Sequence, residues 1–130
     1  MQNSPENPML AAVVDDLATR GWSQQALFLP GDLVRALASE CRRRNAEGEM
    51  NPAGVGRGAS QEVREAIRGD QIQWVDPGQA DACDQYLAAM DQLRLAINQG
   101  LFRGLEDFEC HFALYPPGAF YRRHLDRFRD

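Results

Sequence analysis

The chain has 130 residues and a formal net charge of −5, so it has the length of one domain and an excess of acidic side chains. Apolar residues account for 44% and charged residues for 25%, which excludes a wholly disordered protein. The longest apolar run, Met9 to Val14, is too short to cross a membrane, and an acidic chain is a poor general binder of nucleic acid. We therefore expect neither a membrane nor a nucleic acid as a partner.

Three cysteines are spread along the chain, at Cys41, Cys83 and Cys110. Their number is odd and no pair has the C-x-x-C spacing of a zinc site, so the sequence indicates neither a disulfide framework nor a structural zinc ion. These features favour a reduced protein in the cytoplasm.

A first helix is predicted after a short N-terminal arm. Residues 1–8 are expected to form this loose arm, with Asn7 as the N-cap of the helix and Pro8 as its first residue. Gly21 then supplies the stop. The apolar stripe between these ends has a helical period and consists of Met9, Leu10, Val13, Val14 and Leu17.

A second helix is predicted after an extended segment over residues 22–29. Asp32 is placed to cap this helix, which ends in three arginines at residues 42–44. Its apolar face consists of Leu33, Val34, Leu37, Ala38 and Cys41. Residues 45–60 contain four glycines and few large apolar groups, so they predict a long loop that is either functional or disordered.

The second half of the chain mixes helical and extended patterns. A short helical turn over residues 61–67 and a strand over residues 71–75 are expected first. Residues 81–101 carry the clearest helical period in the chain, through Cys83, Tyr86, Leu87, Met90, Leu93 and Ile97. Residues 107–115 and 120–125 are predicted as strands on either side of a Pro-Pro-Gly turn.

These last two segments form an incomplete β region, because a sheet normally needs three or more strands. Two explanations remain open. Either the earlier strands join the sheet, or the chain is the front part of a longer domain.

The most informative pair of residues is His124 and Asp126. On a strand the side-chain period is two, so both side chains would project from one face. An imidazole and a carboxylate in this arrangement are two of the three ligands of the 2-His-1-carboxylate triad, which binds ferrous iron and leaves positions open for oxygen and a cosubstrate.

Two longer motifs carry a resemblance to a known family. Residues 115–126 read YPPGAFYRRHLD and resemble the metal-binding hairpin of the ferrous iron and 2-oxoglutarate dependent dioxygenases, best of all the prolyl 4-hydroxylase type. Residues 67–74 read IRGDQIQW and resemble an I-R-G-D-x-I-x-W element of the oxygen-sensing prolyl hydroxylases and their bacterial relatives. The two motifs occur in the order of the family.

The resemblance implies a fold and an activity. The fold is an α+β arrangement in which N-terminal helices pack on the first strands of a double-stranded β-helix, or jelly-roll, with its C-terminal strands missing. Residues 9–130 would be the N-terminal portion of the dioxygenase domain. The implied enzyme is an oxidoreductase that uses Fe(II), 2-oxoglutarate and ascorbate to hydroxylate prolyl residues of a protein substrate.

The resemblance also implies roles for single residues. Tyr115 occupies the place of a tyrosine that hydrogen-bonds the 2-oxoglutarate carboxylate, beside the metal ligands His124 and Asp126. Tyr121 corresponds to a tyrosine that lies behind the metal ligands in relatives, although a core aromatic is an equal alternative. His111 shares strand parity with Tyr115 and either faces the same pocket or is a packed, hydrogen-bonded histidine.

The segment before the 67–74 motif corresponds in the family to a loop that folds over the peptide substrate. Arg68 and Asp70 would anchor the far end of that loop, as an ion pair; a purely structural turn is the alternative.

One departure from the family concerns the rest of the site. The family has a distal histidine and, beyond it, an arginine that pairs with 2-oxoglutarate, and His111 lies upstream and cannot be that histidine. The resemblance therefore predicts a truncated chain that is inactive alone. The alternative is a non-catalytic homologue that acts as a protein-interaction module.

Overall fold

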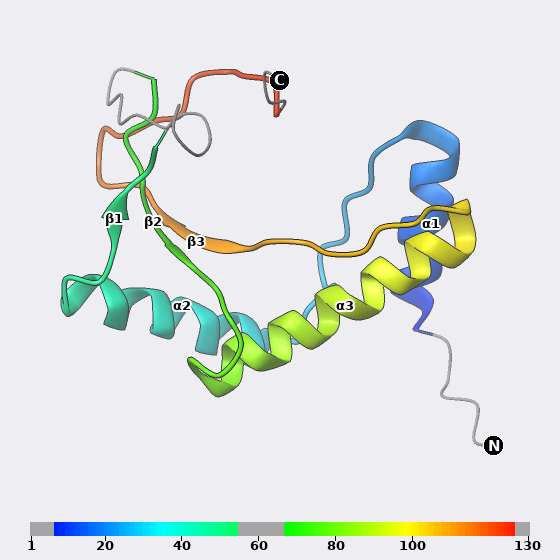
Figure 1. Cartoon of the computed structure of the whole chain (residues 1–130), viewed down its shortest axis with the longest axis horizontal. Coiled ribbons are helices and arrows are strands. Elements are labelled where there is room, and N and C mark those ends of the chain that lie inside the picture. Colours follow the sequence, from blue (N-terminus) through cyan, green and yellow to red (C-terminus); the bar gives the residue numbers. More distant parts are fainter. Residues whose placement is uncertain (1–6, 55–66, 127–130) are drawn as a thin grey trace. The chain divides into compact units, whose positions relative to one another are not determined.

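The computed structural model describes residues 7–54 and 67–126, which fall into two compact units (Figure 1). The first unit contains residues 7–38 and 76–109, and the second contains residues 39–54, 67–75 and 110–126. The elements in chain order are α1 (Pro8–Arg20), α2 (Gly31–Ala46), β1 (Asn51–Pro52), β2 (Gln71–Trp74), α3 (Asp81–Leu101) and β3 (His111–Leu114). The expected α+β composition is confirmed.

The helix α1 begins and ends where the sequence predicts. The side chain of Asn7 accepts a hydrogen bond from the Met9 N–H at 3.0 Å, and Pro8 needs no hydrogen-bond partner at the first position. At the other end Gly21 has φ 80° and donates its N–H to the Leu17 carbonyl. Asn7 therefore caps α1 and Pro8 begins it, so these two residues of the expected loose arm over residues 1–8 belong to the helix end. Residues 1–6 lie outside the described part of the chain.

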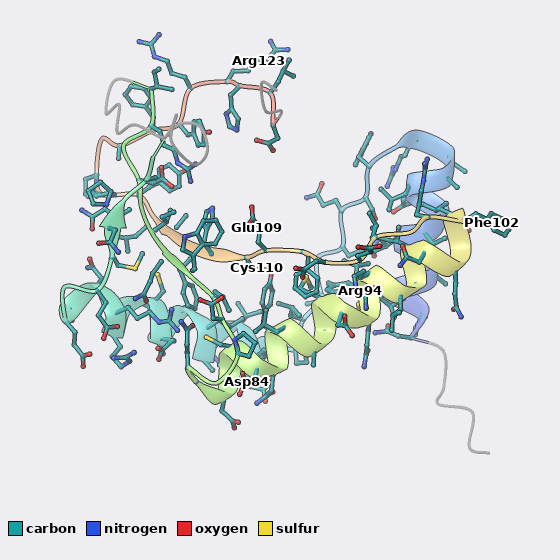
Figure 2. All side chains as sticks on the ribbon, in the orientation of Figure 1. Asp84, Arg94, Phe102, Glu109, Cys110 and Arg123 are labelled. Atoms are coloured by element: carbon teal, nitrogen blue, oxygen red, sulfur yellow. The ribbon has the colours of Figure 1, made fainter. Side chains whose placement is uncertain are left out.

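The helix α3 has the bounds that its apolar period predicts, and it packs against α1. Contact is close at Gly100, where an added Cβ would overlap the Cγ1 of Val14. Phe102 ends the helix in the left-handed region, with φ 52° and its N–H donated to the Asn98 carbonyl. The Phe102 ring is 94% exposed and points away from the helix (Figure 2).

The strands of the second unit form one antiparallel sheet in the order β1-β2-β3. In its longer ladder Gln71 pairs with Leu114 and Trp74 pairs with His111. The predicted strand over residues 71–75 is thus confirmed over Gln71–Trp74, and of the two explanations for the small β region, the earlier strands do join the sheet. The loop expected over residues 45–60 is shorter than predicted at its start, because α2 continues to Ala46. The same segment also contains the strand β1.

Two further expectations are wrong. The extended segment expected over residues 22–29 is interrupted, because residues 26–29 form a turn and a bend, and Trp22 and Leu27 are exposed. The segments 107–115 and 120–125 do not pair with each other in the described residues. Only His111–Leu114 of the first is a strand, and the second contributes a single bridge, between Tyr121 and Arg68. The predicted helical turn lies almost entirely outside the described residues, which include only its last residue, Ile67.

A buried arginine ties the end of α2 to the sheet within the second unit. Arg44 is 2% exposed, and its guanidinium bonds the Glu40 carboxylate at 2.9 Å and the Gln73 side-chain oxygen at 2.8 Å. The same group lies 4.9 Å from the centre of the Phe112 ring. These contacts make Arg44 part of the core.

None of the helices in the described residues is long and apolar enough to span a membrane.

Glu40 gives the stability of this unit a pH dependence. Hydrogen bonds from Arg43 and Arg44 lower the pKa of Glu40 to about 2 from its ordinary 4.5. Since the folded pKa is the lower one, the stabilisation is fully present above the unfolded pKa and is lost as pH falls toward 2. We expect the free energy of unfolding to drop by about 1–2 kcal/mol from this group, because water screens the half-exposed Arg43.

Urea unfolding at neutral pH and at about pH 3 measures the effect. A Glu40→Gln variant is the control, because it cannot ionise. The same loss of stability in the variant as in the original chain would contradict the assignment.

Candidate functional site

The residues predicted to form a site come from two segments of the second unit, residues 67–70 and residues 115–126. The second segment contains Arg123, which Figure 2 labels. Backbone hydrogen bonds join the two segments: the Arg122 N–H donates to the Ile67 carbonyl, and the Gly69 N–H donates to the Phe120 carbonyl, both at 2.8 Å.

The segment from Ile67 to Trp74 therefore pairs with two stretches of the same downstream chain, first residues 120–122 and then β3. Residues 115–119 loop out between these stretches. The loop is suited to this, since Pro116 and Pro117 have no N–H to donate to a ladder and Gly118 has φ 84°. The motif glycine Gly69 lets the chains approach, because an added Cβ would lie 3.3 Å from the Cβ of Ala119.

His124 and Asp126 lie together, as predicted. The Nε2 of His124 is 3.2 Å from the Oδ1 of Asp126. The Nδ1 of His124 is 2.8 Å from the Arg122 carbonyl oxygen, which can only accept a hydrogen bond. Nδ1 therefore carries a proton, and Nε2 is the ring nitrogen that faces the carboxylate. Residues 122–126 are not in a strand, so this juxtaposition comes from the loop and not from strand parity.

Tyr121 stacks on the ring of His124. The two ring centres are 3.7 Å apart and the planes differ by 9°. The guanidinium of Arg68 lies 4.4 Å from the centre of the same tyrosine ring. Two alternatives were open for Tyr121, a tyrosine beside the metal ligands or a core aromatic. The structure has Tyr121 in contact with His124, a predicted metal ligand.

Arg68 and Asp70 form a buried ion pair. The Nε of Arg68 is 2.7 Å from one carboxylate oxygen of Asp70, and its Nη2 is 3.0 Å from the other. The Asp70 side chain is fully buried, and that of Arg68 is 14% exposed. The expected ion pair is thus present. The hydrogen bond that Arg68 donates to Asp70 is the main reason that the pKa of Arg68 is raised above its ordinary value.

Tyr115 borders the same carboxylate. Burial raises the pKa of the Tyr115 hydroxyl, and the negative charge of Asp70 raises it further. The hydroxyl is therefore a hydrogen-bond donor at neutral pH, which is the form that can bind the carboxylate of a small acid. This is compatible with the role that the sequence resemblance implies for Tyr115.

His111 stands apart from this group. Its ring meets Trp74, its cross-strand partner, edge to face with centres 5.3 Å apart, and its Nδ1 lies 3.2 Å from the Phe112 carbonyl oxygen. In the part of the chain that the structure describes, His111 contacts neither His124 nor Asp126. His111 is an exposed residue of β3, and its contacts favour the alternative of a hydrogen-bonded histidine on the sheet.

The donor atoms of His124 and Asp126 fit two ligands of a ferrous iron. Nε2 and a carboxylate oxygen lie 3.2 Å apart, and both are donor atoms that ferrous iron accepts, so one cation can contact both. The bond from Nδ1 to a backbone carbonyl is the outer contact that metal-binding histidines usually make. Among the described residues, no group of three His, Cys, Asp or Glu side chains is placed to hold a metal.

Sequence reasoning from single residues did not identify the contacts that connect the two segments. The stack of Arg68, Tyr121 and His124 has no sequence spacing that reveals it, because Arg68 is far from the other two along the chain. The only available signal was the occurrence of both motifs in one chain.

The geometry defines an α+β unit that brings an I-R-G-D segment against an H-x-D segment. Neither a protein-family model nor a curated protein matches the chain. The chain is similar to the crystal structure of a Pseudomonas putida prolyl-4-hydroxylase, with 87% sequence identity over 92% of this chain and a TM-score of 0.85. It spans 62% of the length of that protein. The chain is a relative of the prolyl-4-hydroxylases, which confirms the resemblance of its motifs.

Proposed function

We propose that this chain is part of a ferrous iron and 2-oxoglutarate dependent dioxygenase that hydroxylates prolyl residues of a protein substrate. The observation that carries the proposal is the geometry of His124 and Asp126, in which an oriented imidazole nitrogen faces a carboxylate. The similarity to a prolyl-4-hydroxylase supports it. When bound, the iron supplies oxidative C–H hydroxylation coupled to decarboxylation of 2-oxoglutarate, and ascorbate keeps it ferrous.

The residues of the chain have separate tasks in this proposal. His124 and Asp126 hold the metal through Nε2 and a carboxylate oxygen. Tyr115 donates its hydroxyl proton to a carboxylate of 2-oxoglutarate, which its raised pKa allows at neutral pH. The protein thereby holds the reacting groups in place, so less translational and rotational entropy is lost on the way to the transition state.

We further propose that the three-stranded sheet contributes the first strands of a jelly-roll. The antiparallel order β1-β2-β3 supports this fold.

We also propose that the protein works in the cytoplasm, on a proline-containing protein substrate. The odd number of cysteines and the lack of C-x-x-C spacing support the cytoplasmic location.

A metal titration tests the assignment. Calorimetry with Mn²⁺, a surrogate for ferrous iron, is expected to show weak binding to the 130-residue chain. In a His124→Ala, Asp126→Ala variant we expect the affinity to fall by more than about 10-fold, because altering an outer contact alone costs 10–100-fold. His111→Ala is the matched control and should leave the affinity unchanged. Equal affinity in the double variant and the original chain would contradict the site.

The second candidate is a non-catalytic homologue that binds a protein partner. It is favoured by one observation: among the described residues His124 and Asp126 lie together, and no third His, Cys, Asp or Glu side chain joins them. We propose that the 130-residue chain alone does not turn over for this reason. Succinate release is the second readout of the same experiment, and release at the rate of the Pseudomonas putida relative would contradict the inactivity.

A further inference from the structure

A single buried carboxylate lies between the two functional parts of the proposed site. The side chain of Asp70 is fully buried, and both of its oxygens bond the guanidinium of Arg68, at 2.7 and 3.0 Å. A bidentate pair of this kind fixes both the position and the plane of the guanidinium. Asp70 therefore determines where Arg68 lies.

On one side Asp70 meets Tyr115. The ladder between β2 and β3 pairs Gln71 with Leu114, so the next step of the register brings Asp70 opposite Tyr115. The charge of Asp70 also contributes to the raised pKa of Tyr115, after burial. The Tyr115 hydroxyl is thus held near a fixed negative charge at the edge of the sheet.

On the other side Asp70 acts through Arg68 on His124. The guanidinium of Arg68 lies 4.4 Å from the centre of the Tyr121 ring, and this ring stacks on His124 at 3.7 Å. The backbone supports the same order, because Arg68 and Tyr121 form a β-bridge. The Nδ1 contact with the Arg122 carbonyl fixes one edge of the His124 ring, and the Tyr121 stack fixes its plane.

We propose that Asp70 is a positioning residue that sets two side chains at once: the Tyr115 hydroxyl directly, and the imidazole of His124 through Arg68 and Tyr121. The side chains assigned to the cosubstrate and to the metal are then held by one buried group. This inference rests on the proposed function for the roles of Tyr115 and His124, but the arrangement itself is independent of any bound metal.

Proton NMR of the metal-free 130-residue chain tests the arrangement. The chain has two histidines, so His111 serves as an internal reference for His124. We expect the stack to move the ring signals of His124 upfield and a Tyr121→Leu variant to abolish this shift. In Asp70→Asn, which keeps the shape and removes the charge, the His124 signals should move toward those of Tyr121→Leu while those of His111 stay in place.

A matched control separates positioning from a general loss of structure. Arg44→Gln removes another buried arginine of the same unit, one that bonds Glu40 and Gln73, and it should leave the His124 signals unchanged. Should Asp70→Asn fail to fold, Arg68→Lys replaces it: lysine keeps the charge but loses the planar stack, and we expect the same shift. If either Asp70→Asn or Arg68→Lys folds and leaves the His124 signals unchanged, the proposal is wrong.

Mn²⁺ affinity provides a second readout. We expect Asp70→Asn to weaken binding, by less than the roughly 10–100-fold that follows loss of a group in direct contact with a metal ligand, and Arg44→Gln to leave it unchanged. The two hypotheses fail in different ways. If removing His124 and Asp126 does not alter Mn²⁺ binding, the proposed function is wrong. If the NMR signals of His124 do not respond to Asp70, the positioning role is wrong, whatever the metal affinity.

Discussion

Replacing Asp70 by alanine is expected to lower the free energy of unfolding by about 3–5 kcal/mol, because it leaves a buried charge without its partner. Arg68 is only 14% exposed and bonds both oxygens of Asp70, so water cannot easily replace the lost carboxylate. The backbone bond from the Ala53 N–H to the Asp70 carbonyl remains in the variant, so the loss reports the side chain. Urea denaturation followed by circular dichroism measures it.

A double variant is the control for this prediction. Arg68→Met combined with Asp70→Leu removes both charges and fills the space with apolar groups, and such replacements of a buried pair are often neutral. We expect the double variant to be more stable than Asp70→Ala. A loss below about 1 kcal/mol in Asp70→Ala would show that the ion pair is exposed to water like an ordinary surface pair.

Gly100→Ala is expected to destabilise the packing of α1 against α3 by about 1–3 kcal/mol, the usual cost of overfilling a packed contact. The sign is informative, because the same change in an open helix position stabilises by about 1 kcal/mol. The added Cβ would overlap the Cγ1 of Val14, a branched side chain with little rotational freedom. Thermal and urea unfolding measure the change.

Two further variants complete this test. Gly104→Ala is the matched control, because nothing lies within 4 Å of the added Cβ, and we expect it to be nearly neutral. Adding Val14→Ala to Gly100→Ala should recover part of the loss, since it removes the overlapping atoms. Additive effects of the two substitutions would show that these helices do not meet at this point.

The helices could be predicted from the sequence because their signals are local. Asn7, Pro8 and Gly21 mark the two ends of α1 by hydrogen-bonding capacity and backbone conformation alone, and α3 follows from an apolar period within 21 residues. Local reasoning was less successful for the strands, since residues 107–115 and 120–125 were both predicted as strands and only His111–Leu114 is one. A strand exists only where a partner strand lies beside it, and that is a property of the tertiary structure.

The predicted site shows the same division. Chemistry and motif order identified His124, Asp126 and Tyr115 as candidates, because the types of these residues and their neighbours are written in the chain. The basis for placing His124 beside Asp126 was nevertheless wrong, since residues 122–126 form no strand and a loop brings the two together.

By itself, the sequence determined the helices, the strand at residues 71–74 and the relationship to prolyl-4-hydroxylases. Only the tertiary structure decided that residues 107–115 and 120–125 form no hairpin with each other and that both lie against residues 67–74. It alone placed Asp70 between Tyr115 and Arg68. The physical reason is that helix ends and motifs depend on neighbours in the chain, whereas strand pairing and buried ion pairs depend on residues far apart in sequence.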